Sequence, residues 1–547
     1  MQQLEPVGDV RYVTSPANDR FPVWTRGNAG EVYPEVFYPL TWSVASDSGE
    51  AAMRRAVLRT GLIRERDLEG QRFSLTAVFG GYSYLNLSIQ RVIARRMIGA
   101  KVEDVEQSYL GNADVVTPYS PRPGDRNLLC SVRGLVHTLR VLRTTELPEL
   151  EADQREVETW RAGLPDPATA PDAELRTTTR AFMPMFERLF ETHLFVSGAT
   201  AIPVGALANL CERELGDRSL HMGLLGGIGD VESAAPSWAL WDLGRAVRAD
   251  DALTAEFDAG VAGLHERLRA RPDAAPFLAD LDRFLAEHGC RGPNEWETAC
   301  HSWGTDPELP LALIDRLRGA DDSQAPELQQ RRLAAERERL TEEIEGRLAR
   351  RKRSNFRRTL AAAHLWSQSR ERSKTTVIRA IHELRLASWE LGRRCAARAG
   401  DGARADDIWF LLDDEVDDYL ADPSSSAATI AERRAARASL AELEPPFFFD
   451  GDLPAPDTWR RRDRAATPAT SGEELAGIAG CPGTATGRVR VVTDPADPTA
   501  LEPGDVLVAP ITDPSWTPLF LAASAVVVDV GAELSHAVIV SRELGIP

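Results

Sequence analysis

Long hydrophobic runs are missing from this chain. Its 547 residues contain no stretch of 18 consecutive apolar side chains, and the N-terminus MQQLEPVGDVRYV has neither the basic region nor the apolar core of a signal peptide. Cysteine is also scarce, because the six cysteines are scattered and none of them forms a CxxC pair. We therefore expect a cytoplasmic protein with reduced thiols.

An excess of positive charge is missing as well. The 64 basic residues are outnumbered by 83 acidic residues, which gives a formal net charge of -19. A surface of this sign repels nucleic acids and anionic membranes at long range, so we expect neither as a partner. The chain is long enough for two or more domains, and its hydrophobic content of 43% is that of an ordinary globular protein.

The sequence patterns divide the chain into four parts. Residues 1–45 are rich in Pro, Gly and aromatic residues and predict an extended lead-in segment, whereas residues 46–446 carry mostly helical patterns. Residues 447–472 combine proline with small polar residues and predict a linker. Residues 473–547 alternate short apolar runs with turns, so the predicted fold is a large mostly α-helical domain followed by a small α/β domain.

The most helical stretch runs from Pro326 to Cys395. It is rich in Ala, Leu, Glu and Arg and has few helix-breaking residues. We expect two long helices that form an antiparallel pair. A single charged helix surrounded by solvent would fit the first half of this stretch equally well.

Three short strands and one helix are predicted near the end of the chain. The strands are GRVRVV (487–492), DVLVAP (505–510) and SAVVVDV (524–530), of which the last is apolar enough to be buried on both faces. The segment SHAVIVSREL then predicts a helix, with Ser535 as its N-cap and Gly545 beyond its C-terminus.

His536 would occupy the first position of that helix. The unpaired backbone N–H groups of the first turn and the positive end of the helix dipole stabilise an anion there and favour the neutral imidazole. Ser535 could donate a hydrogen bond to the same anion. These features suit a histidine that accepts a phosphoryl group, although a histidine that only caps or packs fits the spacing too.

Several C-terminal motifs resemble a known family. GCPGTATGRVRVV, PGDVLVAPITDPSWTPLF and GAELSHAVIVSRELGIP are similar to the phosphohistidine swivelling domain of the PEP-utilising enzyme superfamily, and TDPSWTPLF most resembles the rifampin phosphotransferase branch. The resemblance implies that His536 carries a phosphoryl group from an ATP-binding domain to a second site. In that family the swivelling domain continues beyond GIP, so we expect this one to be truncated at its C-terminus.

Upstream motifs extend the resemblance over nearly the whole chain. VWTRGNAGEVYPEVFYPLTWS, EHGCRGPNEWE, SRERSK and DDIWFLLDDEV are similar to segments of the helical domain of rifampin phosphotransferase-like proteins. The family's ATP-grasp domain would precede SPAND, near which this chain begins, and no Walker-type loop is present. We therefore expect no cofactor in this chain, with ATP and magnesium bound by a partner ATP-grasp protein.

Two basic residues continue an apolar helical stripe. Val377, Ile381, Leu384 and Leu391 recur at helical spacing, and the same face projected backwards carries Lys374 and Arg370. Cations on an inward face are costly unless an anion meets them, and a guanidinium and an ammonium four residues apart can share one phosphate. The resemblance places both at the phosphoryl-accepting site. An internal salt bridge to an acidic residue is the alternative.

Other polar residues are weaker candidates. Arg291 and Glu295 match the family's RG..E landmark and are candidate phosphate-binding or substrate-binding residues, but they could equally pair with each other. Two histidines and two cysteines between residues 288 and 301 fit no common zinc spacing, so we expect a structural turn there and no metal site.

Together these features predict a phosphotransferase component. His536 would carry a phosphoryl group from the ATP-grasp partner to a hydroxyl-bearing small-molecule acceptor in the helical domain, near Arg370 and Lys374. The alternative is a non-catalytic remnant or a regulatory, ligand-binding subunit.

Overall fold

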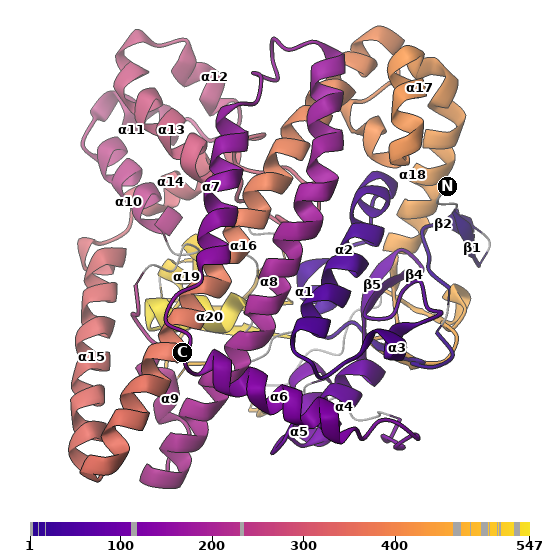
Figure 1. Ribbon diagram of the computed structural model, residues 1–547. Coiled ribbons are helices and arrows are strands. Elements are labelled where there is room, and N and C mark those ends of the chain that lie inside the picture. Colours follow the sequence, from indigo (N-terminus) through magenta and orange to yellow (C-terminus); the bar gives the residue numbers. More distant parts are fainter. Residues whose placement is uncertain are drawn as a thin grey trace.

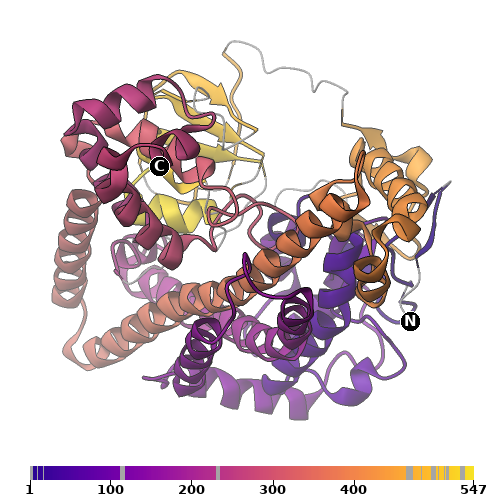
Figure 2. The ribbon, with the colours of Figure 1, turned by 90° about the horizontal axis from the view of Figure 1, so that it is seen from above.

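A computed structural model describes most of the chain. The described residues are 4–8, 10–16, 18–110, 117–229, 235–462, 472–477, 479–481, 483–493, 501–502, 504–510, 512, 516–529 and 536–547. They form a large helical body and, from the last part of the chain, a small α/β domain (yellow in Figures 1 and 2).

Two long helices form the spine of the body. Helix α8 (Asp172–Leu215) and helix α16 (Arg350–Ala399) run side by side, with α2 (Pro39–Arg59) against α8 and α7 (Pro148–Ala162) against α16 (Figure 1). The predicted apolar stripe of α16 faces this core, and Val377 and Leu391 are fully buried. Burial of this stripe drives the pairing of α16 with α8.

Helix α8 is the one described helix that is long and apolar enough to cross a bilayer. Half of its most apolar window is buried inside the protein. Because it also packs along α16 and α2, α8 serves as a core helix of the body.

A four-stranded sheet joins the two ends of the body. The strand order is β4 (Thr76–Phe79), β5 (Tyr82–Asn86), β3 (Val23–Thr25) and β7 (Phe448–Asp450), and all neighbouring strands are antiparallel. Two small ribbons pair β1 (Glu5–Val7) with β2 (Val10–Tyr12) and β6 (Leu443–Glu444) with β8 (Arg460–Arg461).

This sheet changes two of the expected boundaries. The expected lead-in segment, residues 1–45, contains β1 to β3 and helix α1 (Ala29–Val32), and α2 already begins at Pro39. The first part of the expected linker, residues 447–472, belongs to the body, since β7 hydrogen-bonds to β3 across the sheet. The sequence did not predict this because β3 and β7 are far apart in the chain, and pairing between such segments produces no periodic pattern in either of them.

The stretch from Pro326 to Cys395 forms two helices, as expected, but these two helices do not form an antiparallel pair. Helix α15 (Pro326–Arg347) diverges from α16 at the turn between them (Figure 1). Only Pro326 and Ile344 are buried among the described side chains of α15, so it has no apolar stripe to place against α16. It contacts α9 (Leu220–Leu224), α10 (Ala235–Arg248) and the small domain instead.

The remaining helices cover the spine. A compact group with its own hydrophobic core contains α10, α11 (Asp251–Asp258), α12 (Leu264–Arg269), α13 (Ala275–His288) and α14 (Glu308–Arg318). The others are α3 (Glu65–Leu68), α4 (Leu87–Arg96), α5 (Val102–Leu110), α6 (Leu128–Val141), α17 (Val416–Ala421) and α18 (Ala427–Ala441).

The small domain contains a parallel three-stranded sheet. Its order is β11 (Ala525–Val528), β10 (Val506–Ala509) and β9 (Val489–Val491), accompanied by α19 (Thr517–Ala522) and α20 (His536–Leu544). The three strands and the last helix lie where the sequence predicts them. The expectation that β11 is buried on both faces is wrong, because β11 is an edge strand and Val527 is 49% exposed.

Candidate functional site

Three of the predicted polar residues meet inside the body. Lys374 Nζ on α16 lies 2.8 Å from Glu295 Oε1, and Arg291 Nη1 lies 3.3 Å from Glu295 Oε2. Arg291 Nη2 also donates a hydrogen bond of 2.5 Å to Thr375 Oγ1 on α16. The side chains of Arg291 and Glu295 are almost fully buried, and that of Lys374 is 14% exposed.

The loop after α13 carries Arg291 and Glu295 and is held against α16 by a buried arginine. Arg385, which is fully buried, donates hydrogen bonds to the backbone oxygens of Glu295 (2.8 Å) and Glu297 (3.1 Å). Gly292 allows the close approach, because a Cβ there would lie 2.8 Å from Ser302 Cα. The loop is therefore a rigid support for its two charged side chains.

Electrostatics decide the charge of Glu295. Burial by itself raises its pKa, but Lys374 and Arg291 outweigh burial and lower the pKa below the ordinary value. Glu295 is therefore ionised and pairs with both cations. The salt bridges that the sequence left open as alternatives are present, and they hold Lys374 in place on an inward face.

Arg370 lies one helical turn before Lys374. Its Nη1 is 2.7 Å from Glu371 Oε1, and its side chain is 21% exposed, more than that of Lys374. Arg370 and Lys374 thus extend from the buried ion pair toward a more accessible edge of α16.

Two titratable residues that the sequence did not single out also face these cations. Burial raises the pKa of the half-buried Glu31 in α1 to about 7, although Arg370 and Lys374 lower it. Burial and, to a lesser extent, the same two cations lower the pKa of His193 in α8 to about 3. His193 Nδ1 lies 3.0 Å from Ser373 Oγ on α16.

Little in the sequence pattern identifies Glu31 and His193 as site residues. Glu31 lies in the segment RGNAGEVYP, which carries part of the family resemblance, and follows Asn28, whose φ is 67°. A non-glycine residue with positive φ is uncommon and marks a constrained turn. His193 stands in an apolar helix, where a histidine usually serves packing.

An apolar pocket shares an aromatic wall with the residue that follows Glu295. It has a volume of about 70 Å³ and lies between α2, α8 and the β4–β5 hairpin. Tyr33 and Phe190 line it, and Phe190 packs edge-on against Trp296 at 5.8 Å between ring centroids. Trp296 directly follows Glu295, so these aromatic rings link the pocket to the charged cluster.

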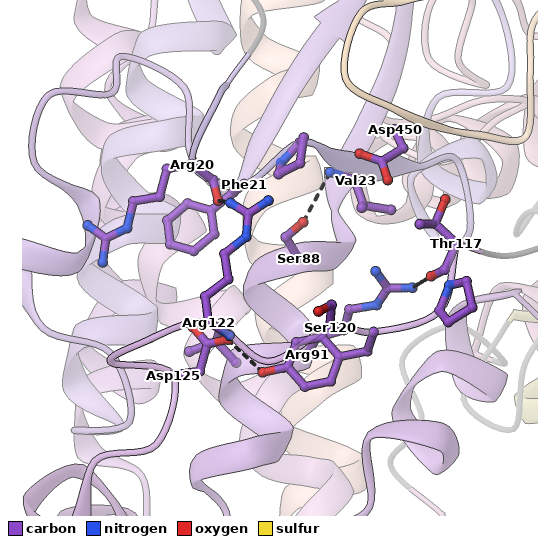
Figure 3. A pocket seen from close by; sticks show the side chains of 14 residues that line it. Arg20, Phe21, Val23, Ser88, Arg91, Thr117, Ser120, Arg122, Asp125 and Asp450 are labelled. Atoms are coloured by element: carbon purple, nitrogen blue, oxygen red, sulfur yellow. Dashed lines mark hydrogen bonds between the residues drawn. The ribbon is translucent and has the colours of Figure 1, made fainter.

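A larger cavity of about 120 Å³ lies elsewhere (Figure 3). Among the predicted site residues whose side chains are described, none lines it. Its arginines are held by protein oxygens, since Arg91 donates to the Thr117 backbone oxygen at 2.7 Å and Arg122 to that of Arg20 at 2.7 Å. Tyr119 donates to Asp125 at 2.7 Å in the same wall.

The loop between residues 288 and 301 forms a turn. The His301 ring stacks on Trp389 at 4.4 Å, and Cys290 is buried in the main hydrophobic core. Across the described parts of the chain, no group of three or more His, Cys, Asp or Glu residues could hold a metal ion.

Helix α20 begins at His536, as the sequence predicts. Ser535 and the side chain of His536 lie outside the described residues. The helix packs against α15, and Gly545 at its end lies beside Arg332 and Leu333. The small domain is therefore docked on the helical body.

A glycine-rich loop at residues 226–229 contacts both α20 and α16. A Cβ on Gly226 would lie 3.6 Å from the Arg542 backbone oxygen of α20. Gln368 on α16 donates hydrogen bonds to the backbone oxygens of Ile228 (3.2 Å) and Gly229 (3.0 Å) in the same loop. Gln368 precedes Arg370 by two residues, so the loop contacts the stretch of α16 that carries the cations, but on a different side of the helix.

Two family descriptions match this chain. The one for the rifampicin phosphotransferase fourth domain matches residues 193–371, which include His193, Arg291, Glu295 and Arg370. The one for the PEP-utilising enzyme mobile domain matches residues 501–547, which include His536.

Three curated proteins are similar to parts of this chain. An uncharacterised protein of Mycobacterium tuberculosis is 34% identical over 259 residues, which are 47% of this chain and 27% of that protein. The prodigiosin synthesizing transferase PigC of Serratia marcescens is 27% identical over 500 residues, 85% of this chain and 54% of PigC. A rifampicin phosphotransferase of Streptomyces sviceus is 28% identical over 273 residues, 49% of this chain and 30% of that enzyme.

The chain thus spans about half or less of the length of these relatives, with a helical part and a mobile-domain part that both match one kind of enzyme. The docked α/β domain with His536 at the start of α20, the cation cluster on α16 and these matches agree with one another. Residues 193–371 and 501–547 thus match parts of PEP-utilising enzymes, and the chain is similar to the rifampicin phosphotransferases.

Proposed function

We propose that the chain is a phosphotransferase component in which His536 delivers a phosphoryl group to a hydroxyl-bearing small molecule bound in the helical body. The observation that carries this proposal is the loop at residues 226–229, which touches α20 and accepts hydrogen bonds from Gln368, two residues before Arg370 on α16. A carrier helix docked on this loop is tied to the stretch of α16 that carries the cations, and a movement of the small domain would bring His536 to them.

The charged cluster suits an incoming phosphoryl group. Arg370 and Lys374 would offset the negative charge on the transferring group, while Glu295 and Arg291 keep Lys374 in position. The bond between the histidine nitrogen and phosphorus breaks as the acceptor oxygen forms its own bond to phosphorus. The ring nitrogen that does not carry phosphorus is protonated before the transfer, so the imidazole of His536 leaves as a neutral ring.

The proton of the acceptor hydroxyl needs a base. Glu31 faces Arg370 and Lys374 and has a pKa of about 7, so its carboxylate can accept a proton near neutral pH. His193, whose pKa is about 3, stays neutral and is the weaker candidate. Glu31 would therefore receive the hydroxyl proton.

The acceptor would be partly apolar and aromatic. Tyr33 and Phe190 line a pocket whose wall contacts Trp296, the residue after Glu295, and its volume of about 70 Å³ is below the roughly 300–1,000 Å³ of typical ligand pockets. An acceptor larger than a single ring would require these side chains to move. The name of one relative, rifampicin phosphotransferase, gives rifampicin as the acceptor of that enzyme.

The phosphoryl donor would be ATP on an ATP-grasp protein. Magnesium would be bound there together with the nucleotide, and His536 would be phosphorylated when the small domain reaches that site.

Labelled ATP tests the carrier role. The purified chain is mixed with candidate ATP-grasp proteins and ATP labelled in its β- or γ-phosphate, and acid-labile label on the chain is measured. Wild type should acquire label, His536→Ala should not, and His265→Ala, which alters a histidine of α12, should behave as wild type. Equal labelling of wild type and His536→Ala would refute the carrier role.

The same experiment addresses the alternative, a regulatory or ligand-binding subunit. In that case the chain binds the ATP-grasp protein, or changes its activity, without acquiring label. The internal neutralisation of Lys374 by Glu295 is the feature that favours this alternative, because a site without catalysis would retain it.

A further inference from the structure

Helix α6 is apolar on two opposite faces. Its inner face, Cys130, Gly134, His137 and Val141, is buried against the body, where the His137 ring lies 5.6 Å from that of Phe195 on α8. A narrow inner face of this kind is enough to attach the helix. It leaves the rest of α6 on the outside of the molecule (Figure 1).

The outer face carries an exposed apolar stripe. Leu128, Val132, Leu135 and Leu139, here called the outer stripe, are 82%, 48%, 43% and 39% exposed. Leu129 and Val136 beside it are 55% and 51% exposed. Contiguous apolar surface of this kind on a soluble protein marks an interaction site.

The spacing of the outer stripe fits a second helix. Steps of four, three and four residues are those of the seam between two helices in a coiled coil. The order of these spacings is the same from either end of the helix. An antiparallel copy of α6 would therefore place Leu128 opposite the second Leu139, and Val132 opposite the second Leu135.

We propose that α6 forms the centre of a two-fold interface between two copies of this chain. A two-fold interface requires a surface that complements itself, and the outer stripe does so in antiparallel orientation. This proposal concerns assembly and does not depend on the proposed transfer reaction.

The polar residues of α6 permit this pairing. Ser131 and Thr138 flank the outer stripe on one side, with Leu129 and Val136 on the other, so no charged side chain borders the seam. Arg133 and Arg140 point further round the helix. Two copies would not bring like charges directly together across the contact.

The exposed area reaches what a stable contact needs. With roughly 160–190 Å² for a fully exposed Val or Leu, the six exposed side chains offer about 600 Å² per copy, or about 1,200 Å² for two, the lower bound for specific interfaces. We therefore expect a weak dimer, with a Kd of roughly 1–100 µM.

The location of α6 leaves the proposed site free. The small domain lies on the far side of α8 and α16 from α6 (Figures 1 and 2). Pairing through α6 would therefore not obstruct α20 or the cations of α16.

An anionic membrane is the competing occupant. Four arginines and no acidic residue lie between Arg126 and Arg143, and a basic helix with an exposed apolar face is typical of membrane-surface binding. The net charge of -19 of the whole chain opposes approach to such a surface. We therefore favour the second copy and make the membrane an outcome of the test.

Analytical ultracentrifugation of the full chain tests the pairing. Wild type should change from monomer to dimer between about 1 and 100 µM, whereas Val132→Lys and Leu135→Glu should each stay monomeric. Mixing these two variants should restore a one-to-one dimer, because antiparallel pairing places the new lysine opposite the new glutamate. Arg133→Glu, a charge change outside the stripe, should dimerise as wild type does.

Three results would overturn the proposal. One is a wild type that remains monomeric over this range, and another is a dimer that survives both single substitutions. The third is a monomer that floats with vesicles of anionic lipid but not with neutral ones, which would assign α6 to a membrane. Circular dichroism of each variant shows whether the helical content is unchanged, so loss of pairing is distinguishable from loss of fold.

Discussion

Lys374 Nζ on α16 lies 2.8 Å from Glu295 Oε1, a carboxylate that is almost fully buried in the loop after α13. This pair joins two segments that are distant in the sequence. It also fixes one of the two cations proposed to meet the phosphoryl group, so the same contact serves stability and positioning.

Removing one partner of this pair should destabilise the body. Lys374→Met leaves Glu295 with only Arg291, and breaking a buried ion pair costs about 3–5 kcal/mol. We expect a loss of about 3 kcal/mol in the free energy of unfolding, measured by urea denaturation. Adding Glu295→Gln should lower the stability further, because the buried Arg291 then loses its carboxylate partner, and a double variant as stable as wild type would contradict the ion-pair account.

The pH dependence of Glu31 provides a second test. Because its folded pKa is raised to about 7, the folded state binds its proton more tightly, and the cost of ionising the buried carboxyl develops as pH rises from about 4.5 to 7. Relative to wild type, Glu31→Gln should therefore gain thermal stability as pH rises through this range.

The same substitution separates stability from chemistry. If Glu31 receives the acceptor proton, phosphoryl transfer by wild type should rise with pH toward a plateau above about pH 7, and Glu31→Gln should lose this rise together with at least about tenfold in rate. Phosphorylation of His536 should not change. An unaltered transfer rate would remove Glu31 from the mechanism.

The lowered pKa of His193 should make the stability of the folded chain sensitive to acid. Its folded pKa of about 3 lies below the ordinary value of 6.5, so the unfolded chain binds more protons between these pH values. The stability that neutral His193 contributes is present above pH 6.5 and is lost as pH falls toward 3. Melting curves of His193→Gln should show a smaller drop in Tm from pH 7 to pH 5 than wild type, and an identical drop would contradict this assignment.

Arg385 should be essential for the shape of the site loop. Arg385→Met removes the donors to the Glu295 and Glu297 backbone oxygens, and each buried carbonyl left unpaired costs about 1–3 kcal/mol. We expect a lower Tm and faster hydrogen exchange in residues 289–306. Arg393→Met, which alters an exposed arginine of the same helix, is the control and should change neither.

The strand and helix pattern of the small domain could be predicted from sequence, because periods of two and 3.6 residues are local properties. The stripe of Val377 and Ile381 likewise predicted the inward face of α16 on which Lys374 lies. In contrast, the partner of Lys374 remained open between a phosphate and an acidic residue. A contact between distant segments has no periodic signature, so only the folded chain identifies Glu295.

Packing also decided where α15 lies. Its composition predicts a helix, but the expected pairing with α16 failed because α16 buries its apolar stripe against α8. Packing likewise decided which face of α6 is buried. The sequence of α6 has apolar residues on two opposite faces, and only the fold shows which of the two stays exposed.

The sequence by itself thus determined the helical body, the small α/β domain and the start of α20 at His536, because each depends on residues close together along the chain. The tertiary structure decided which carboxylates meet the cations, which face of α6 is free and where α20 docks. Those outcomes depend on burial and on long-range contacts, whose energies exist only once distant segments have come together.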